Sequence, residues 1–172
     1  FLGNRASGKM GFALAEAAAL LGATVTLVAG PVSLQVSRHR QAITRVNIES
    51  ADQLAEQVLS RLERGALDVI VMAAAVADYR PTQVAPQKLK KSDDQQGLTL
   101  QLQRTKDILA MLGQRRAEQG TRRPLLVGFA AETEQVAVHA QAKLLKKNCD
   151  VIVANDVAEA GIGFGSDENR VT

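Results

Sequence analysis

The chain has 172 residues, of which 46% are hydrophobic and 23% charged, as in a single globular domain with a substantial core. No apolar run approaches the length of a membrane span and the first residues lack the order of a secretion signal, so we expect a cytoplasmic protein. A net charge of +3 with no Trp, one Tyr and four Phe fits a small anionic ligand and argues against nucleic acid.

Helical and extended patterns alternate along the whole chain. Apolar residues follow helical spacing at about 8–21, 51–64, 106–119 and 133–147. Short β-branched runs separate them at 23–28, 67–72, 125–129 and 150–154, with a weaker one at 44–48. This order predicts βαβ units, and hence an α/β fold with a doubly wound, mostly parallel Rossmann-like sheet and helices on both faces.

The first helix is preceded by a glycine-containing loop, Gly-Asn-Arg-Ala-Ser-Gly-Lys-Met-Gly, at residues 3–11. Glycines let the backbone approach an anion closely, and the first turn of a helix offers N–H groups and a positive dipole end. Lys9 opposes that dipole unless an anion is present. The loop therefore predicts a bound anion, against the alternative of a turn that only connects strand and helix.

Neither familiar phosphate-binding motif fits this loop completely. Gly3, Gly8 and Lys9 satisfy G-x-x-x-x-G-K, but Met10 stands where a P-loop needs a hydroxyl for magnesium. The spacing G-x-G-x-x-G of dinucleotide-binding folds is absent.

Ligands of open α/β sheets bind at the carboxyl ends of the strands, here at residues 3–11, 73–80, 128–132 and 154–157. The small side chains of 73–77 leave space there, and Asp78 is the first acid after that strand. An alanine-rich strand end packed against a helix, with Asp78 as a turn residue, is the alternative interpretation.

Two basic segments lie outside these strand ends. Residues 80–97 lose all periodicity and contain Lys88-Leu89-Lys90-Lys91, which predicts either a flap over an anion or a solvated surface loop. The last predicted helix has His139, Lys143 and Lys147 at four-residue spacing. A helix C-terminus favours lysines in any case, but together with Lys9 and Lys88 these side chains suit a triphosphate.

Several other chemistries are excluded. A short-chain oxidoreductase needs Tyr with Lys four residues on, whereas Tyr79 is the one tyrosine and position 83 is Gln. No G-x-S-x-G elbow is present. The single cysteine, Cys149, and the two distant histidines predict no metal site from protein side chains, although Mg²⁺ carried by a nucleotide remains possible.

Four segments, in this order, closely resemble phosphopantothenate–cysteine ligase: residues 4–11, 74–79, 88–91 and 127–133. Residues 154–157 and 163–167 continue the match, so that the resemblance covers the whole chain. This family forms the synthetase half of the bifunctional bacterial coenzyme A biosynthesis flavoprotein. The resemblance implies a single nucleotide-binding ligase domain over residues 1–172, with a flap at about 80–97.

The implied reaction has two steps. The carboxylate of 4'-phosphopantothenate attacks the α-phosphorus of CTP, and the amine of L-cysteine then displaces CMP from the acyl-cytidylate. The first step brings an anion onto a polyphosphate, so cations and Mg²⁺ must neutralise the charge. The resemblance assigns this task to Lys88, while the amide of Asn4 holds the acyl group for the amine.

The resemblance also implies two pockets. The phosphopantothenate pocket involves Asn4, Ala74, Ala75 and Asp78. The CTP pocket involves residues Met72, Ala73, Ala74, Asp78, Lys88, Lys106, Asp107, Ile108, Leu109, Phe129, Lys143 and Lys147. Many relatives carry proline before the aspartate where this chain has Lys106-Asp107.

Partners and cofactors follow from the same family. A homodimer is expected, in agreement with a helix 8–21 that is apolar almost all round. FMN is expected only with an upstream decarboxylase domain fused to this one, and no nucleic acid or membrane partner is expected. The chain begins inside or just after its first expected strand and ends where an element starts, so we interpret it as a fragment trimmed at both ends. An NAD(P)-dependent reductase and a non-catalytic nucleotide-binding module are the alternatives.

Overall fold

The computed structural model describes residues 6–36, 41–65, 67–88, 97–132, 136–156 and 171. Its elements are, in chain order, α1 (Lys9–Leu20), β1 (Val25–Ala29), β2 (Ile43–Asn47), α2 (Ala51–Arg64), β3 (Val69–Met72), β4 (Tyr79–Pro81), β5 (Leu102–Arg104), α3 (Ile108–Glu118), β6 (Leu125–Glu132), α4 (Val136–Lys147) and β7 (Val151–Asp156). The predicted α/β alternation is confirmed, because each predicted helix and strand has its counterpart among these elements. The expected helix start at residues 133–135 lies outside the described residues.

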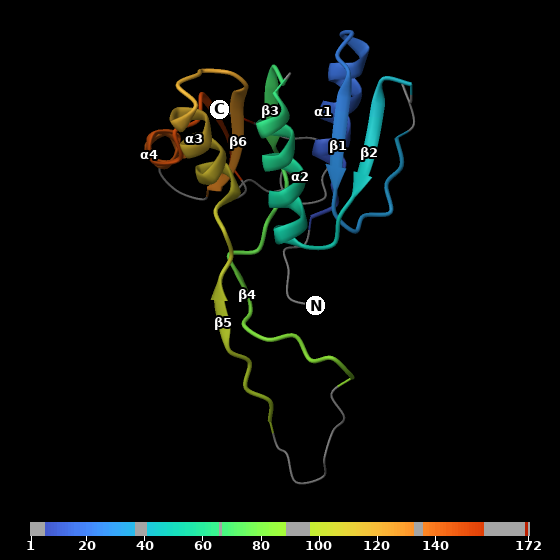
Figure 1. Cartoon of the computed structure of the whole chain (residues 1–172), viewed down its shortest axis with the longest axis vertical. Coiled ribbons are helices and arrows are strands. Elements are labelled where there is room, and N and C mark those ends of the chain that lie inside the picture. Colours follow the sequence, from blue (N-terminus) through green and yellow to red (C-terminus); the bar gives the residue numbers. More distant parts are fainter. Residues whose placement is uncertain are drawn as a thin grey trace.

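The strands are mostly parallel but do not join into one sheet within the described ranges. β1 and β2 form a parallel pair (Figure 1), and β3, β6 and β7 form a parallel sheet with β6 in the centre. The expected strand ahead of the glycine loop falls at or before residues 1–5, outside the described residues.

Helices cover both faces of β1. Val25 and Leu27 pack with Ala15 and Ala19 of α1, whereas Val28, on the opposite face, packs against a cluster that includes α2. Two layers of helix around a parallel strand pair are the arrangement of a doubly wound fold.

The main core lies between α2, α3 and the β3–β6 pair. Leu112 of α3 and Leu126 of β6 are fully buried, and Leu54, Val58 and Ile70 surround them. The apolar positions of α2 recur at Leu54, Val58 and Leu62, which gives one buried stripe. Ser50 and Gln53 close a reciprocal capping box at the start of this helix.

Residues 79–88 and 97–105 form an arm that the sequence did not predict as strands. β4 and β5 pair in antiparallel fashion, and the N–H of Thr82 donates to the carbonyl of Gln101 at 3.0 Å. Figure 1 shows this ribbon, green to yellow, extending away from the helices and the parallel strands. The expected loop at 80–97 is therefore partly extended structure, and its residues 89–96 lie outside the described part.

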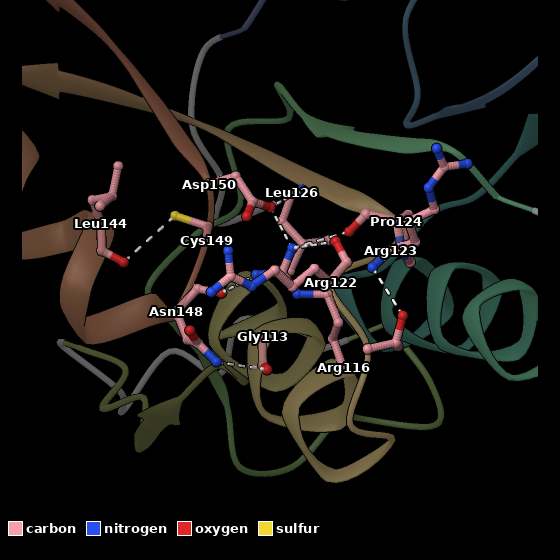
Figure 2. A network of polar contacts seen from close by, with 11 residues as sticks. Gly113, Arg116, Arg122, Arg123, Pro124, Leu126, Leu144, Asn148, Cys149 and Asp150 are labelled. Atoms are coloured by element: carbon pink, nitrogen blue, oxygen red, sulfur yellow. Dashed lines mark hydrogen bonds and ion pairs between the residues drawn. The ribbon is translucent and has the colours of Figure 1, made fainter.

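A polar network ties α3 to the start of β6 and β7, and Figure 2 shows its members converging. The guanidinium of the buried Arg116 forms an ion pair with Asp150 and donates to the carbonyls of Pro124 at 3.0 Å and Asn148 at 2.9 Å. The carboxylate of Asp150 also accepts from the N–H of Leu126 at 2.7 Å. A buried guanidinium needs such partners, since an unpaired one is costly.

Two glycines permit close approach in the same region. A Cβ on Gly113 of α3 would collide with the carbonyl of Lys147, and a Cβ on Gly128 of β6 would collide with the side chain of Leu109. The side-chain amide of Asn148 donates to the carbonyl of Gly113 at 3.1 Å. Asn148 has a φ of 47°. These contacts fix the end of α4 against the middle of α3.

Within the described ranges, no helix has the length and apolar character needed to cross a bilayer.

Candidate functional site

The segment that follows β3 forms an open bend of small residues. Ala74 and Ala75 are exposed and Ala73 is half-buried, while Met72 packs against the main core. The N–H of Val76 donates to the carbonyl of Ala74 at 3.1 Å, which turns the chain. The side chains of this bend leave its main-chain groups accessible at the carboxyl end of β3, where the fold class places ligands.

Asp78 joins this bend to the arm. Its carbonyl accepts from the N–H of Thr105 at 2.8 Å, and its side chain is exposed. The two limbs of the arm therefore leave the body side by side, with Asp78 on one limb and Lys106 just beyond the other.

The N-terminus of α3 brings several predicted site residues together. Asp107 caps the helix, because its carboxylate accepts from the N–H of Ala110 at 3.1 Å. Lys147 contacts the same carboxylate, with Nζ 3.1 Å from Oδ2 and 3.2 Å from Oδ1. The structure thus brings together predicted site residues from two distant segments, Lys106-Asp107 and Lys147.

Ile108 and Leu109 are buried, so their side chains belong to the core. The first N–H groups of a helix have no partner inside it and point outward along its axis. The main-chain N–H groups of Ile108 and Leu109 are therefore the groups with which these residues can bind a phosphate.

Lys106 takes part in a second cluster that the sequence reasoning missed. Its Nζ lies 3.5 Å from Oδ1 of Asp52, and the guanidinium of Arg80 forms an ion pair with Oδ2 of the same carboxylate. Asp52 lies in the first turn of α2, where an acid is favoured by the helix dipole alone. An acid in the first turn of this helix can be seen in the sequence, but the sequence does not indicate that Arg80 and Lys106 are its partners.

The described end of the glycine loop matches its expected role as a helix entry. Gly8 is the residue before α1 and has φ of 79°, a conformation that favours glycine. A Cβ on Gly8 would lie 3.3 Å from the side chain of Val32. Arg45 donates to the carbonyls of Val32 and Leu34, and its guanidinium lies 5.3 Å from the ring centre of Phe12. Asn4 lies outside the described residues.

The remaining predicted residues are spread over three elements. Lys88 is exposed on the arm, Phe129 is half-buried in β6, and Lys143 is half-buried one turn before Lys147 in α4. The structure brings Lys147 to the start of α3, with Lys143 one turn earlier in the same helix, and it places Lys88 on the arm.

The rim of the strand ends also holds polar atoms without protein partners. In the described part of the chain, the buried side-chain N and O atoms that lack a hydrogen bond are Arg80 Nε, Thr105 Oγ1 and Asn155 Oδ1. Thr105 contacts Asp78, and Asn155 belongs to the last residues of β7. Native proteins seldom bury such atoms without a partner, so their position at this rim fits a polar ligand.

Two shallow hollows in the described part of the chain lie away from this rim. One of about 400 Å³ lies at the amino ends of β3 and β6, between Leu62, Asp68 and Pro124, and one of about 250 Å³ lies beside Met111 on the outside of α3. Both are shallow and face away from the strand ends that carry the site residues. Among the described side chains, no group of three or more metal-ligating residues converges.

Comparison with known proteins matches this chain to one family. The family model described as the DNA/pantothenate metabolism flavoprotein C-terminal domain matches residues 1–172. The Coenzyme A biosynthesis bifunctional protein CoaBC of Bacillus subtilis is 48% identical over 172 residues, and that of Vibrio vulnificus is 44% identical over 172 residues. Both alignments cover 100% of this chain but 40% and 41% of the relatives, so the chain spans about two fifths of their length.

A solved structure agrees. The crystal structure of the C-terminal domain of Coenzyme A biosynthesis bifunctional protein CoaBC superimposes with a TM-score of 0.70 and 42% identity, covering 88% of this chain and 65% of that one. The Rossmann-like α/β fold and the resemblance to the ligase half of the coenzyme A flavoprotein are thereby confirmed. This chain belongs to the DNA/pantothenate metabolism flavoprotein C-terminal domain family.

Proposed function

We propose that this domain ligates 4'-phosphopantothenate to L-cysteine at the expense of CTP. A carboxylate oxygen attacks the α-phosphorus, the bond to pyrophosphate breaks, and an acyl-cytidylate forms. The cysteine nitrogen then attacks the acyl carbon, CMP leaves with the carboxylate oxygen, and the nitrogen loses a proton. The products are phosphopantothenoylcysteine, CMP and pyrophosphate.

The observation that carries this proposal is the group of lysines and free helix N–H groups at the start of α3. The chain that contains it is 48% identical to a bifunctional coenzyme A biosynthesis protein. Lys106, Lys147 and the N–H groups of Ile108 and Leu109 supply positive potential at this end of the helix, against the single carboxylate of Asp107. The first turn of α3 contains no acid, whereas that of α2 contains Asp52. A polyphosphate is the kind of ligand that such a cationic helix start binds.

The residue roles that we propose are those that the family resemblance implies. Lys143 and Lys147 neutralise the triphosphate, Met72, Ala73 and Phe129 border the nucleotide, and the bend at Ala74 and Ala75 receives phosphopantothenate with Asp78 at its edge. Lys88 neutralises the approaching carboxylate, and Asn4 orients the acyl group for the amine. Mg²⁺ arrives with CTP as part of the substrate, which suits a rim whose described residues present lysines and main-chain donors.

The wider setting is proposed on the same family grounds. We infer a cytoplasmic homodimer, in which the exposed Leu20 and Leu21 at the end of α1 and the exposed Leu98 and Leu100 of the arm are covered by a second copy. FMN belongs to the proposal only where a decarboxylase domain is fused to this one. Sedimentation velocity at tens of micromolar tests the dimer, and a monomer would contradict it.

The decisive experiment measures pyrophosphate release in the full-length protein with CTP, Mg²⁺ and phosphopantothenate. We expect release that depends on phosphopantothenate and product that requires cysteine. Titration with NADPH instead of CTP tests a reductase, and CTP binding without turnover would indicate a non-catalytic module.

Lys88→Gln refines that experiment, because only the first step sets a carboxylate against a triphosphate. A single-turnover assay should show pyrophosphate release slowed by at least about tenfold, whereas Lys90→Gln, the control in the same basic run, should release it at the normal rate. Pyrophosphate release at the normal rate by Lys88→Gln would contradict this role and would favour the alternative, that Lys88 belongs to a solvated surface loop.

A further inference from the structure

We propose that Asp52 is a positioning residue that fixes the base of the arm, and with it Lys106, for the reaction proposed above. Only the effect on catalysis rests on the proposed function; the anchoring of the arm does not. The base of the arm is defined here as residues 79–82 and 101–106. Its anchoring is a property of the described geometry and is measurable without substrate.

One carboxylate bonds to both limbs of the arm. Oδ2 of Asp52 pairs with Arg80, which lies within β4, and Oδ1 lies 3.5 Å from Nζ of Lys106, which follows β5 by two residues. The limbs are held to each other by their own ladder and by the hydrogen bond from Thr105 to Asp78. Asp52 therefore links the paired limbs, as a unit, to the first turn of α2.

The helix that carries Asp52 is itself firmly placed. α2 begins with the capping box of Ser50 and Gln53, and Leu54 and Val58 are buried in the main core. A carboxylate in the second position of such a helix has a fixed origin and gains from the dipole. Asp52 is therefore a fixed point to which Arg80 and Lys106 of the arm bind.

The exposure of the three side chains limits the strength of the link. The side chains of Asp52, Arg80 and Lys106 are 44%, 41% and 58% exposed. Ion pairs of this kind are weak singly and sensitive to salt. The consequence we infer is a bias in the orientation of the arm rather than an effect on global folding.

Lys106 adds the connection to the proposed site. It immediately precedes Asp107, the cap of α3 that Lys147 contacts. Because Asp52 holds its ammonium group, the Lys106 side chain is directed toward α2. Lys106 itself precedes the start of α3, which we assign to the triphosphate. The carboxylate thereby sets both the angle of the arm and the direction of one phosphate-binding cation.

Hydrogen exchange of Asp52→Asn tests the anchoring directly. We expect the N–H groups of Thr82 and Thr105 to exchange about two- to five-fold faster than in the unchanged protein, the range that loss of a partly exposed ion-pair cluster gives. Amides in the middle of α2 should not change. Glu56→Gln, an exposed acid one turn further along the same helix, is the matched control and should leave the arm unaffected.

Two further measurements separate anchoring from a local effect on α2. Asp52→Glu should restore slow exchange, and 1 M NaCl should bring the unchanged protein close to Asp52→Asn. Faster exchange confined to the first turn of α2, with the arm unchanged, would show that Asp52 only complements the helix dipole and would overturn the inference.

Steady-state kinetics of the full-length protein then test the consequence. Asp52→Asn should lower kcat for pyrophosphate release several-fold without raising the KM for CTP, because the change loosens the arm and removes a negative charge near the nucleotide. A raised KM with unchanged kcat would overturn the positioning role. If the unchanged protein neither binds nor turns over CTP, the proposed function fails, whereas the exchange result still decides whether Asp52 anchors the arm.

Discussion

Lys147, the last residue of α4, contacts both carboxylate oxygens of Asp107, the residue that caps α3. The pair joins the end of one helix to the start of another across 40 positions of sequence. It neutralises the one acid at a helix start where we place a triphosphate, and it holds the lysine there before a ligand arrives. A preorganised cation is more effective than one that must be ordered on binding.

Lys147→Gln should weaken CTP binding by about tenfold, since it removes a charge-assisted contact and exposes the phosphate to the uncompensated carboxylate of Asp107. Calorimetric titration with CTP and Mg²⁺ measures the effect. Lys146→Gln is the control, because that exposed side chain is its neighbour in the same turn. Equal losses in both variants would show only a general effect of charge.

Asn4→Asp in the full-length protein should slow amide formation more than activation. A carboxylate accepts but does not donate at neutral pH and repels the acyl-cytidylate, so it cannot replace an amide that does both. Acyl-cytidylate should then accumulate in quenched reactions followed by chromatography. A variant that forms the amide at the normal rate and shows no intermediate would contradict the role given to Asn4.

Gly113→Ala should lower the free energy of unfolding by about 3 kcal/mol, because the added methyl meets the main chain of Lys147 rather than a side chain that can rotate away. Urea denaturation measures it. Gly11→Ala is the contrasting change, since no described atom lies within 4 Å of its added Cβ and alanine favours a helix interior. It should be neutral or stabilise by up to about 1 kcal/mol.

Asp150 should make stability depend on pH in the acidic range. Burial alone would raise the pKa of its carboxyl, but the hydrogen bonds from Arg116 and Leu126 and the charges of Arg116 and Arg122 outweigh it, and the pKa is lowered from its ordinary value of 3.8. A depressed folded-state pKa gives stability that is present above the unfolded value and lost as the pH falls through the folded value.

Urea midpoints at pH 7, 4 and 3 check this expectation. Asp150→Asn should be less stable at pH 7 and lose less on acidification than the unchanged protein. Asp68→Asn, which removes an 86% exposed partner of Arg123, should follow the unchanged protein at each pH. Parallel losses in Asp150→Asn and the unchanged protein would mean that other carboxyl groups govern acid unfolding.

The pKa of Cys149 is shifted in the opposite direction from the pKa of Asp150, its neighbour in sequence. Burial raises the pKa of the Cys149 thiol, and its Sγ contacts the carbonyl of Leu144 at 3.8 Å (Figure 2). The thiol therefore favours its protonated form and packs as part of the main core.

Local sequence determined the helices and the parallel strands of this protein and their order. Buried parallel strands need continuous β-branched runs and their helices need one apolar stripe, so 67–72 and 51–64 could be assigned without tertiary information. The rule that ligands sit at the carboxyl ends of such strands then indicated the bend at 73–78. The glycine loop and the later motifs indicated the family because they stand in a fixed order over the whole chain.

Pairings between distant segments were decided only by the tertiary structure. β4 and β5 are three residues each and lack any alternation, so their pairing depends on the arm that brings them together. Likewise Asp52, Arg80 and Lys106 are ordinary surface residues by local pattern, and Arg116 resembles any basic residue near a helix C-terminus. Burial and ion pairing are set by what packs opposite a side chain, and that information lies elsewhere in the chain.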